Sequence, residues 1–432
     1  MEQLKNTAKT ALKALASAGA EKAKCDVGYS ITHEFNVDGG EFSLFRTLFD
    51  KHLVLSAIRE GKMGTVRQNR YDEETVKALA KSCLETAESA VPDEAWDVAP
   101  AAEPRDFVYG ALSSDNEKLF ARCKELMQDV KERYPKILME QMIVTHKEVR
   151  SVHANSNGVL YGEHCGYYEV SLMYSGHEGE KASSFFGSGF TVYDLDRPFM
   201  ECGSVAKDFA DVEKQIETSS VEGKFEGVML LPPSALSSFL GYLLSNFAGD
   251  AALLQGTSPW KDALGQSVAD TSITLSASPL DDRIVCGERV TDDGFLAENY
   301  DIIRDGVLRQ FMLSLYVSNK TGNKRAPNGS YSLVMKEGDR SLDEIVAGIE
   351  RGIVVGRFSG GNPSSNGDFS GVAKNSFLIE KGKVTKALSE TMISGNLGDM
   401  LKHVTGISRE RVADGSTVLP YAAFGGITVS GK

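Results

Sequence analysis

Hydrophobic side chains follow two different periods in about the first 220 residues. Residues 26–36 and 43–58 are rich in Val, Ile, Phe and Leu, and the sequence REGK at 59–62 predicts the turn of a β-hairpin. From Asp72, a suitable N-cap, apolar side chains recur every three or four residues, which predicts an amphipathic helix. The stripe consists of Val76, Leu79, Ala80, Cys83, Leu84 and Ala87. Helices that alternate with antiparallel-looking strands are typical of an α+β fold.

A segment that contains several prolines divides this region. Residues 89–106 place these prolines among acidic residues and alanines, a composition that helices and central strands tolerate poorly. We therefore predict a linker between a first domain, residues 1–106, and a middle domain, residues 107–222. The middle domain should contain a helix after Asp115, strands near 137–142, 151–154, 167–173 and 185–192, and a helix near 207–219.

Strand patterns outnumber helical ones in the rest of the chain. A short apolar strand at 228–231 precedes a helix predicted at 235–247, and the pair Asp305-Gly306 between apolar runs predicts a second hairpin. A capping-box spacing at Ser341 predicts another short helix. We therefore predict an α+β fold, in which an N-terminal mixture of helices and antiparallel sheet precedes a β-rich C-terminal domain, residues 223–432, with a few helices.

A glycine-rich stretch lies between residues 352 and 400. A buried-looking strand at 353–355 leads into a loop at 360–371 that is rich in Gly, Asn and Ser, and further strands are expected near 377–379 and 393–397. Glycine permits positive φ and close approach of another backbone. The loop therefore either lines a groove with backbone groups or forms tight turns. The candidate groove residues are Gly360, Gly361, Asn362, Gly395 and Asn396.

Composition and charge narrow the class of protein. The 432 residues include 60 acidic and 47 basic side chains, with a net charge of −13 and no dense run of Lys and Arg, which argues against direct nucleic-acid binding. No apolar run approaches the roughly 18 residues of a membrane span, and Lys5, Lys9 and Lys13 interrupt the N-terminal segment, unlike a secretory signal. Six scattered cysteines without a C-x-x-C pair suit a reducing compartment. We therefore expect a soluble, cytoplasmic protein.

The spacings that catalysis imposes are largely missing. The two His-Glu pairs, at 33–34 and 177–178, lack the second histidine that a zinc-binding helix needs. The sequence nearest to a G-x-S-x-G nucleophile elbow is residues 265–269, which centre on Ser267 but end in alanine. Ser267 is therefore the candidate nucleophile if the chain is a metal-independent hydrolase.

Several ordered motifs in the C-terminal half resemble the TldD/TldE (PmbA) family, whose members are also called modulators of DNA gyrase. The resemblance covers most of the chain and is densest in residues 227–432. Its motifs are Gly256-Thr257-Ser258, Asp293-Gly294, IRDGVL at 303–308, SNKTGNKR at 318–325, GGNP at 360–363, LIEKGK at 378–383 and ISGNL at 393–397. The resemblance implies a cytoplasmic assembly in which TldD is a metalloprotease and TldE is its companion. Such a pair degrades or trims small unfolded peptides, including leader peptides and antitoxins.

The zinc motif of TldD-type chains, H-E-x-x-x-H, aligns with residues 237–242 of this sequence. Ser237 and Tyr242 stand where the histidines would be, and Ser238 stands for the glutamate. The late cysteine ligand is missing as well, since the last cysteine is Cys286. Hydroxyl groups are poor zinc ligands, and serine cannot serve as the general base. The resemblance therefore implies a TldE-type chain that binds no metal, with zinc expected in a TldD-type partner.

Three hypotheses remain open at the level of sequence. The leading hypothesis is a TldE-like subunit, inactive alone, that helps to build the peptide chamber of a TldD-like protease. The loop at 360–371 and the strands near 377–396 would then offer backbone groups to an extended peptide. The alternatives are a hydrolase that uses Ser267 and a non-enzymatic modulator that binds DNA gyrase. Self-association is compatible with each.

Overall fold

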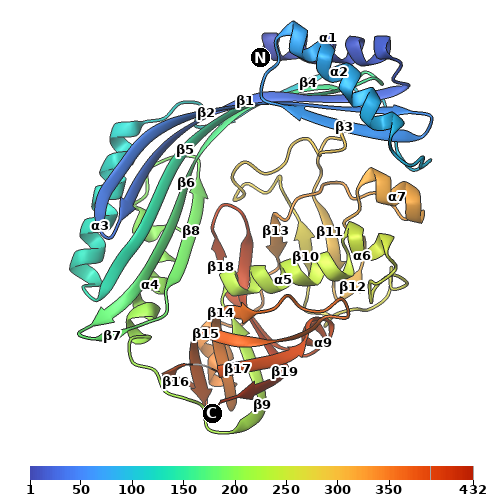
Figure 1. Ribbon diagram of the computed structural model, residues 1–432. Coiled ribbons are helices and arrows are strands. Elements are labelled where there is room, and N and C mark those ends of the chain that lie inside the picture. The colour runs from blue at the N-terminus through green and yellow to red at the C-terminus, as the bar shows by residue number, and fades with distance from the viewer. Residues whose placement is uncertain (390, 432) are drawn as a thin grey trace.

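A computed structural model describes residues 1–389 and 391–431 and divides the chain into two halves, each built on one sheet. The N-terminal half contains a strongly curved eight-stranded sheet that arches over the C-terminal half (Figure 1). Its strand order is β3-β2-β1-β5-β6-β4, and β7 and β8 also pair with β6. The strands are β1 Lys22–Asp38, β2 Glu41–Arg59, β3 Lys62–Gln68, β4 Arg105–Gly110, β5 Ile137–Asn155, β6 Leu160–Glu178, β7 Lys181–Ala182 and β8 Phe186–Val192.

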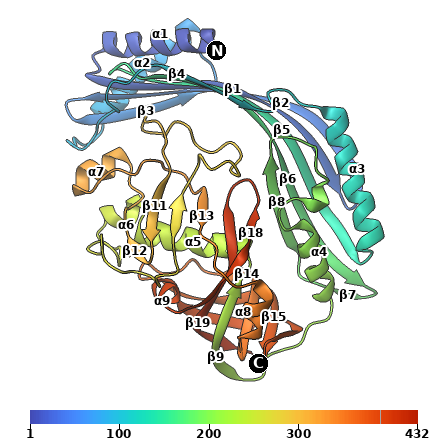
Figure 2. The same cartoon turned by 180° about the vertical axis from the view of Figure 1, so that it is seen from behind.

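Helices cover both ends of this arch, as the two opposite views show (Figures 1 and 2). At one end α1 and α2 pack on the sheet through buried side chains such as Leu15 and Cys83, and α3 and α4 form a second core near the other end. The predicted caps Asp72 and Asp115 are confirmed, since each carboxylate accepts a backbone N–H in the first turn of its helix. The helices are α1 Glu2–Ala18, α2 Glu73–Glu88, α3 Asn116–Arg133, α4 Val205–Lys214 and the short η1 Phe199–Glu201.

One strand of the arch is longer than the sequence indicates. The predicted strands 137–142 and 151–154 are the two ends of β5, which runs without a break. The polar residues between them, THKEVR at 145–150, lack strand-like alternation, but β1 and β6 hydrogen-bond to them on both sides. Strands from both predicted N-terminal domains thus share one sheet, while the boundaries at 106 and 222 remain predictions.

The C-terminal half contains an eleven-stranded sheet that partly closes on itself. Its order is β12-β11-β10-β13-β19-β17-β15-β14-β9, and a further pairing of β19 with β9 joins β9, β14, β15, β17 and β19 into a barrel. The strands are β9 Lys224–Leu231, β10 Leu275–Ala277, β11 Tyr300–Arg304, β12 Val307–Leu308, β13 Leu333–Met335, β14 Arg351–Gly360, β15 Asp368–Glu380, β16 Lys383–Leu388, β17 Thr391–Asn396, β18 Val404–Ala413 and β19 Val418–Ser430.

Few helices accompany this sheet, and the predicted α+β fold is confirmed. Two local predictions also hold, since Asp305-Gly306 turns between β11 and β12 and Ser341 forms a capping box with Glu344. No helix formed by the described residues is both long and apolar enough to cross a membrane. The helices of this half are α5 Pro233–Phe247, α6 Asp250–Leu254, α7 Leu315–Thr321, α8 Leu342–Ala347 and α9 Leu397–Lys402.

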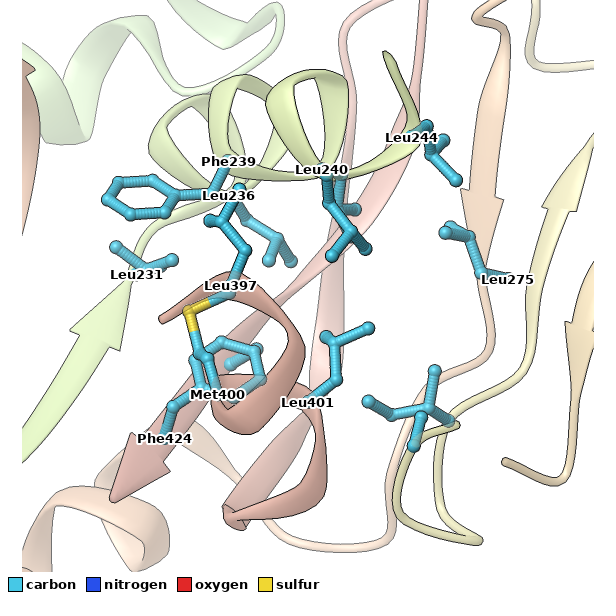
Figure 3. Close-up of a cluster of buried hydrophobic side chains, with 14 of the residues drawn as sticks. Leu231, Leu236, Phe239, Leu240, Leu244, Leu275, Leu397, Met400, Leu401 and Phe424 are labelled. Atoms are coloured by element: carbon cyan, nitrogen blue, oxygen red, sulfur yellow. The ribbon is translucent and has the colours of Figure 1, made fainter. Parts of the chain in front are cut away.

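The largest hydrophobic core joins α5 to the sheet and to α9 (Figure 3). Leu236 and Leu240 of α5 point toward Met400 and Leu401 of α9, and all four side chains are buried. Each such side chain contributes about 1.5–3 kcal/mol relative to exposure in water. This core fixes one face of α5, so the opposite face of the helix is turned outward.

Candidate functional site

The residues aligned with the zinc motif lie on the outward side of α5. Ser238 is exposed, Ser237 and Tyr242 are half-buried, and Tyr242 also packs against the core. The Oγ of Ser238 donates a hydrogen bond to the carbonyl of Ser234 at 3.2 Å, one helical turn earlier. A Cβ added to Gly241 would meet no heavy atom within 4 Å, so space is open above this turn of the helix.

This face of α5 offers hydroxyl groups rather than imidazole, thiolate or carboxylate. Within residues 1–389 and 391–431, no group of three or more His, Cys, Asp or Glu side chains is arranged to hold a metal ion. His403 directly follows α9, which packs against α5, and its Nδ1 lies 2.9 Å from the carbonyl of Asp399. The prediction that this chain binds no metal remains a prediction.

The candidate groove residues lie together where β14, β15 and β17 meet. Gly360 pairs with Gly371 of β15, and Gly395 pairs with Phe369 two positions earlier on the same strand. Gly361 and Asn362 belong to the exposed tip that joins β14 to β15. The structure therefore brings these residues to one end of the barrel.

Two of these residues have structural roles of their own. A Cβ on Gly395 would lie 2.9 Å from Cδ1 of Ile427 and 3.0 Å from Cζ of Phe369, so packing alone excludes a larger side chain. Asn396 caps α9 by accepting the N–H groups of Gly398 and Asp399. For Gly395 and Asn396, tight packing and local geometry are enough to explain the residue type without any contact to a peptide. Gly361 has no such neighbour within 4 Å.

Part of one edge of β14 carries backbone N–H and C=O groups that pair with no other strand of the described chain. Residues 352–354 pair with β9, whereas on that side residues 355–360 have no strand partner in the described part of the chain. Phe358 packs edge-on against Phe239 of α5, with ring centroids 5.4 Å apart. The Nδ2 of Asn246, near the end of α5, reaches the carbonyls of residues 363 and 364 at 3.4 and 3.3 Å. The free edge of β14 therefore runs alongside α5.

A small cavity of about 40 Å³, lined mostly by apolar atoms, lies where this edge begins. Its lining includes Ser234, Gly356, Asn375 and Asp208, the last contributed by α4 of the N-terminal half. Burial raises the pKa of Asp208 to about 6, although Ser204 and Ser188 each donate a hydrogen bond to its carboxylate. The Oδ1 of Asn375 is buried without a partner among the described residues. The carboxylate of Asp208 and the amide oxygen of Asn375 therefore lie at this cavity among apolar side chains.

The motif SNKTGNKR at 318–325 joins the two halves. The Nζ of Lys320 lies 2.6 Å from Oδ2 of Asp93 in the linker, and Tyr316 stacks on Trp96 with ring centroids 3.9 Å apart. The Asp93 carboxylate also accepts a hydrogen bond from the Tyr316 hydroxyl at 2.9 Å. This motif therefore contributes to docking the C-terminal half onto the linker.

A larger cavity lies beside this contact, and no pattern in the sequence indicates it. It has a volume of about 310 Å³, and its lining includes Asp250, Glu288, Asp293 and Arg325. Burial raises the pKa of the Glu288 carboxyl to about 7. Glutamate is normally exposed, so the sequence does not indicate that Glu288 is half-buried. The only sign of the cavity in the sequence is that the motif residues Asp293 and Arg325 line it as well.

Comparison with known proteins gives matches over the whole chain. Residues 226–431 match the family model described as the PmbA/TldA metallopeptidase C-terminal domain. The metalloprotease PmbA of Escherichia coli O157:H7 is 22% identical over 441 aligned positions, which cover 98% of this chain and 96% of that protein.

Two solved structures share the fold. TldE from Thermococcus kodakarensis is 19% identical and has a TM-score of 0.87, and the alignment covers 98% of this chain and all of that one. A protein from Bacteroides thetaiotaomicron described as a modulator of DNA gyrase is 24% identical, with a TM-score of 0.88 and full coverage of both chains. This chain belongs to the TldD/TldE (PmbA) family of metallopeptidase homologues.

Proposed function

We propose that this chain is a TldE-type subunit that binds no metal and works in the cytoplasm with a TldD-type zinc metalloprotease. The assembly would act on small unfolded peptides such as leader peptides and antitoxins, and this chain alone would be inactive. The observation that carries the proposal is the outward face of α5, where Ser237, Ser238 and Tyr242 occupy the positions of the zinc motif.

These three side chains do not fit a zinc ion. Zinc in proteins takes imidazole, thiolate or carboxylate ligands, and each of the three residues offers only a neutral hydroxyl group. The hydroxyl of Ser238 is also directed to the backbone of its own helix. We therefore assign no catalytic step to a metal in this chain and place the chemistry in the partner.

The free edge of β14 supports the peptide-binding part of the proposal. An extended peptide can pair with unpaired N–H and C=O groups at residues 355–360, which recognises backbone rather than sequence. The exposed tip with Gly361 and Asn362 lies at the end of this edge. Gly360, Gly361 and Asn362 are accordingly the residues that we propose contact the peptide.

A second strand edge supports assembly with another subunit. Residues 53–59 of β2 pair with β3, whereas in the described chain residues 41–52 pair only with β1. This stretch exposes large apolar side chains, and Phe49 is 74% exposed. An open strand edge with apolar side chains is a typical protein contact surface. The exposed apolar residues are Phe42, Leu44, Phe45, Leu48 and Phe49.

The surroundings of Ser267 do not support the alternative of a metal-independent hydrolase. Its Oγ donates to the carbonyl of Ala269 at 3.4 Å, and no histidine within the described ranges hydrogen-bonds to it. A serine nucleophile needs an adjacent base to remove its proton.

The test compares the purified chain alone with the chain plus a TldD-type partner. We expect the isolated chain to contain no stoichiometric zinc by elemental analysis and to leave unfolded peptides intact, whereas the mixture cleaves them and loses activity with a chelator. Stoichiometric zinc in the isolated chain would contradict the proposal. A pull-down that retains gyrase but no TldD-type chain would favour the gyrase-binding alternative.

A further inference from the structure

Two cysteines from opposite halves of the molecule meet where the halves touch. Cys165 lies on β6 of the arch and is 5% exposed, whereas Cys286 is half-buried in the loop between β10 and β11. The two thiol groups lie close enough for each to shift the pKa of the other, lowering that of Cys165 and raising that of Cys286. In the sequence β7, β8, β9 and β10 lie between the two cysteines, so they come together only in the folded chain.

Two tyrosines hold this pair in place. Tyr109 of β4 is in register with Cys165, and its hydroxyl hydrogen-bonds to Glu163. The hydroxyl of Tyr193 accepts the backbone N–H of Cys286 at 2.8 Å. The rings of Tyr109 and Tyr193 meet edge-on with centroids 6.4 Å apart. Both cysteines are therefore tied to one aromatic cluster.

The backbone at Cys286 is in an unusual conformation. Its φ of 50° lies in the left-handed region, which residues with a Cβ adopt rarely. The next residue is packed tightly, since a Cβ on Gly287 would lie 2.0 Å from the carbonyl of Pro279. Surrounding contacts, including the hydrogen bond from its N–H to Tyr193, thus hold Cys286 in place although the local backbone is unfavourable.

We propose that Cys165 and Cys286 form a reversible disulfide when the protein meets a hydroperoxide, so that a covalent bond locks the C-terminal loop to the arch. The thiolate of one cysteine attacks the peroxide oxygen, which gives a sulfenic acid and, for hydrogen peroxide, one molecule of water. The second thiol then attacks the sulfenic sulfur, its proton leaves with the hydroxide as a second water, and the S–S bond forms. Two thiols are oxidised by two electrons while one peroxide is reduced.

The thiol pKa of Cys165 differs in direction from those of two other cysteines, which favours oxidation of this pair. The neighbouring Cys286 thiol lowers the pKa of the Cys165 thiol, which favours the reactive thiolate. Burial instead raises the pKa of Cys83 to about 11 and of Cys123 to about 12, so these two remain protonated thiols. Peroxide should therefore oxidise Cys165 and Cys286 in preference to Cys83 and Cys123.

The test treats the purified chain with a small excess of hydrogen peroxide and counts thiols after denaturation. We expect the count to fall from six to four, with one intrachain Cys165–Cys286 peptide pair by mass spectrometry and full recovery after dithiothreitol. The thermal midpoint should rise on oxidation. Cys286→Ser should keep its remaining five thiols, whereas Cys83→Ser should still lose two.

Three results would overturn the inference. They are six thiols after peroxide treatment, a disulfide that involves another cysteine, and disulfides only between separate chains. The peptide analysis of the wild-type chain decides the matter even if a serine variant folds poorly. The outcome is independent of the proposed function, because it requires neither a partner nor peptide cleavage.

Discussion

Arg325 donates two hydrogen bonds to the carboxylate of Asp293, from Nε at 2.9 Å and from Nη2 at 2.8 Å. Both side chains are mostly buried, with 16% and 21% exposed. The same carboxylate accepts the backbone N–H of Leu315 at the start of α7. The pair thereby connects the turn at Asp293-Gly294 to the helix that docks on the linker.

Loss of this pair should destabilise the fold. Arg325→Ala leaves the Asp293 carboxylate buried with only neutral donors, and breaking a buried ion pair costs about 3–5 kcal/mol. Because these side chains keep some solvent contact, we expect about 3 kcal/mol in urea unfolding. The matched control is Lys77→Ala in the exposed pair with Glu73, which should leave stability nearly unchanged because solvent screens this pair. Equal effects of the two substitutions would contradict this account.

Asp208 should make stability depend on pH. Its folded pKa of about 6 lies above the ordinary value of 3.8, so the folded state holds the proton more tightly than the unfolded state. The contribution is fully present below pH 3.8 and is lost as the pH rises through 6. The difference in pKa corresponds to about 3 kcal/mol.

The measurement is the free energy of unfolding of the wild type and Asp208→Asn between pH 4 and 7. The wild type should lose stability relative to the variant over this range. Contributions from other groups such as Glu288 cancel in the comparison. Parallel curves for the two proteins would show that Asp208 is not the group responsible.

Alanine substitutions at two glycines should distinguish a role in packing from a role in peptide binding. Gly395→Ala forces a methyl group against Ile427 and Phe369 and should cost about 1–3 kcal/mol. Gly361→Ala meets open space and should leave stability nearly unchanged. If the tip at residue 361 contacts peptide, the second variant should still slow cleavage by the assembly. Unchanged cleavage with Gly361→Ala would remove this residue from the proposed contact.

The open edge of β2 should govern assembly. Leu48→Lys and Phe49→Lys place charges on exposed apolar positions, which should weaken association without lowering the thermal midpoint of the isolated chain. Sedimentation velocity of the mixture with the partner, or of the chain alone if it self-associates, reports the change. Val91→Lys, at an 82% exposed position in the linker, is the control. Wild-type association of both β2 variants would exclude this edge.

Local chemistry allowed much of the fold to be predicted. The caps at Asp72, Asp115 and Ser341 and the hairpin at Asp305-Gly306 depend on neighbouring residues only, and each has its predicted geometry. The helix expected at 207–219 ends earlier, at Lys214, because the following residues form a turn and the side chain of Gln215 bonds to the carbonyl of Ser376 in β15.

Sequence patterns do not predict contacts between residues that are far apart in the chain. The continuity of β5 depends on two flanking strands, and the docking of Lys320 on Asp93 joins residues more than two hundred positions apart. The candidate groove residues lie at one end of the barrel, where Gly395 serves packing and Asn396 caps a helix, and their contact with a peptide remains a prediction. The sequence alone does not distinguish a glycine required by a neighbouring side chain from one required by a bound ligand.

The barrel has a consequence for biosynthesis. Its last strand, β19, completes the ring by pairing with β9 and β17, yet it ends at Ser430. On the ribosome, β9 and α5 therefore emerge long before the strand that closes their barrel is available. The apolar face of α5 therefore lacks part of its core until β19 has emerged and paired with β9. A chain truncated before β19 should consequently be cleared rather than accumulate as a stable half.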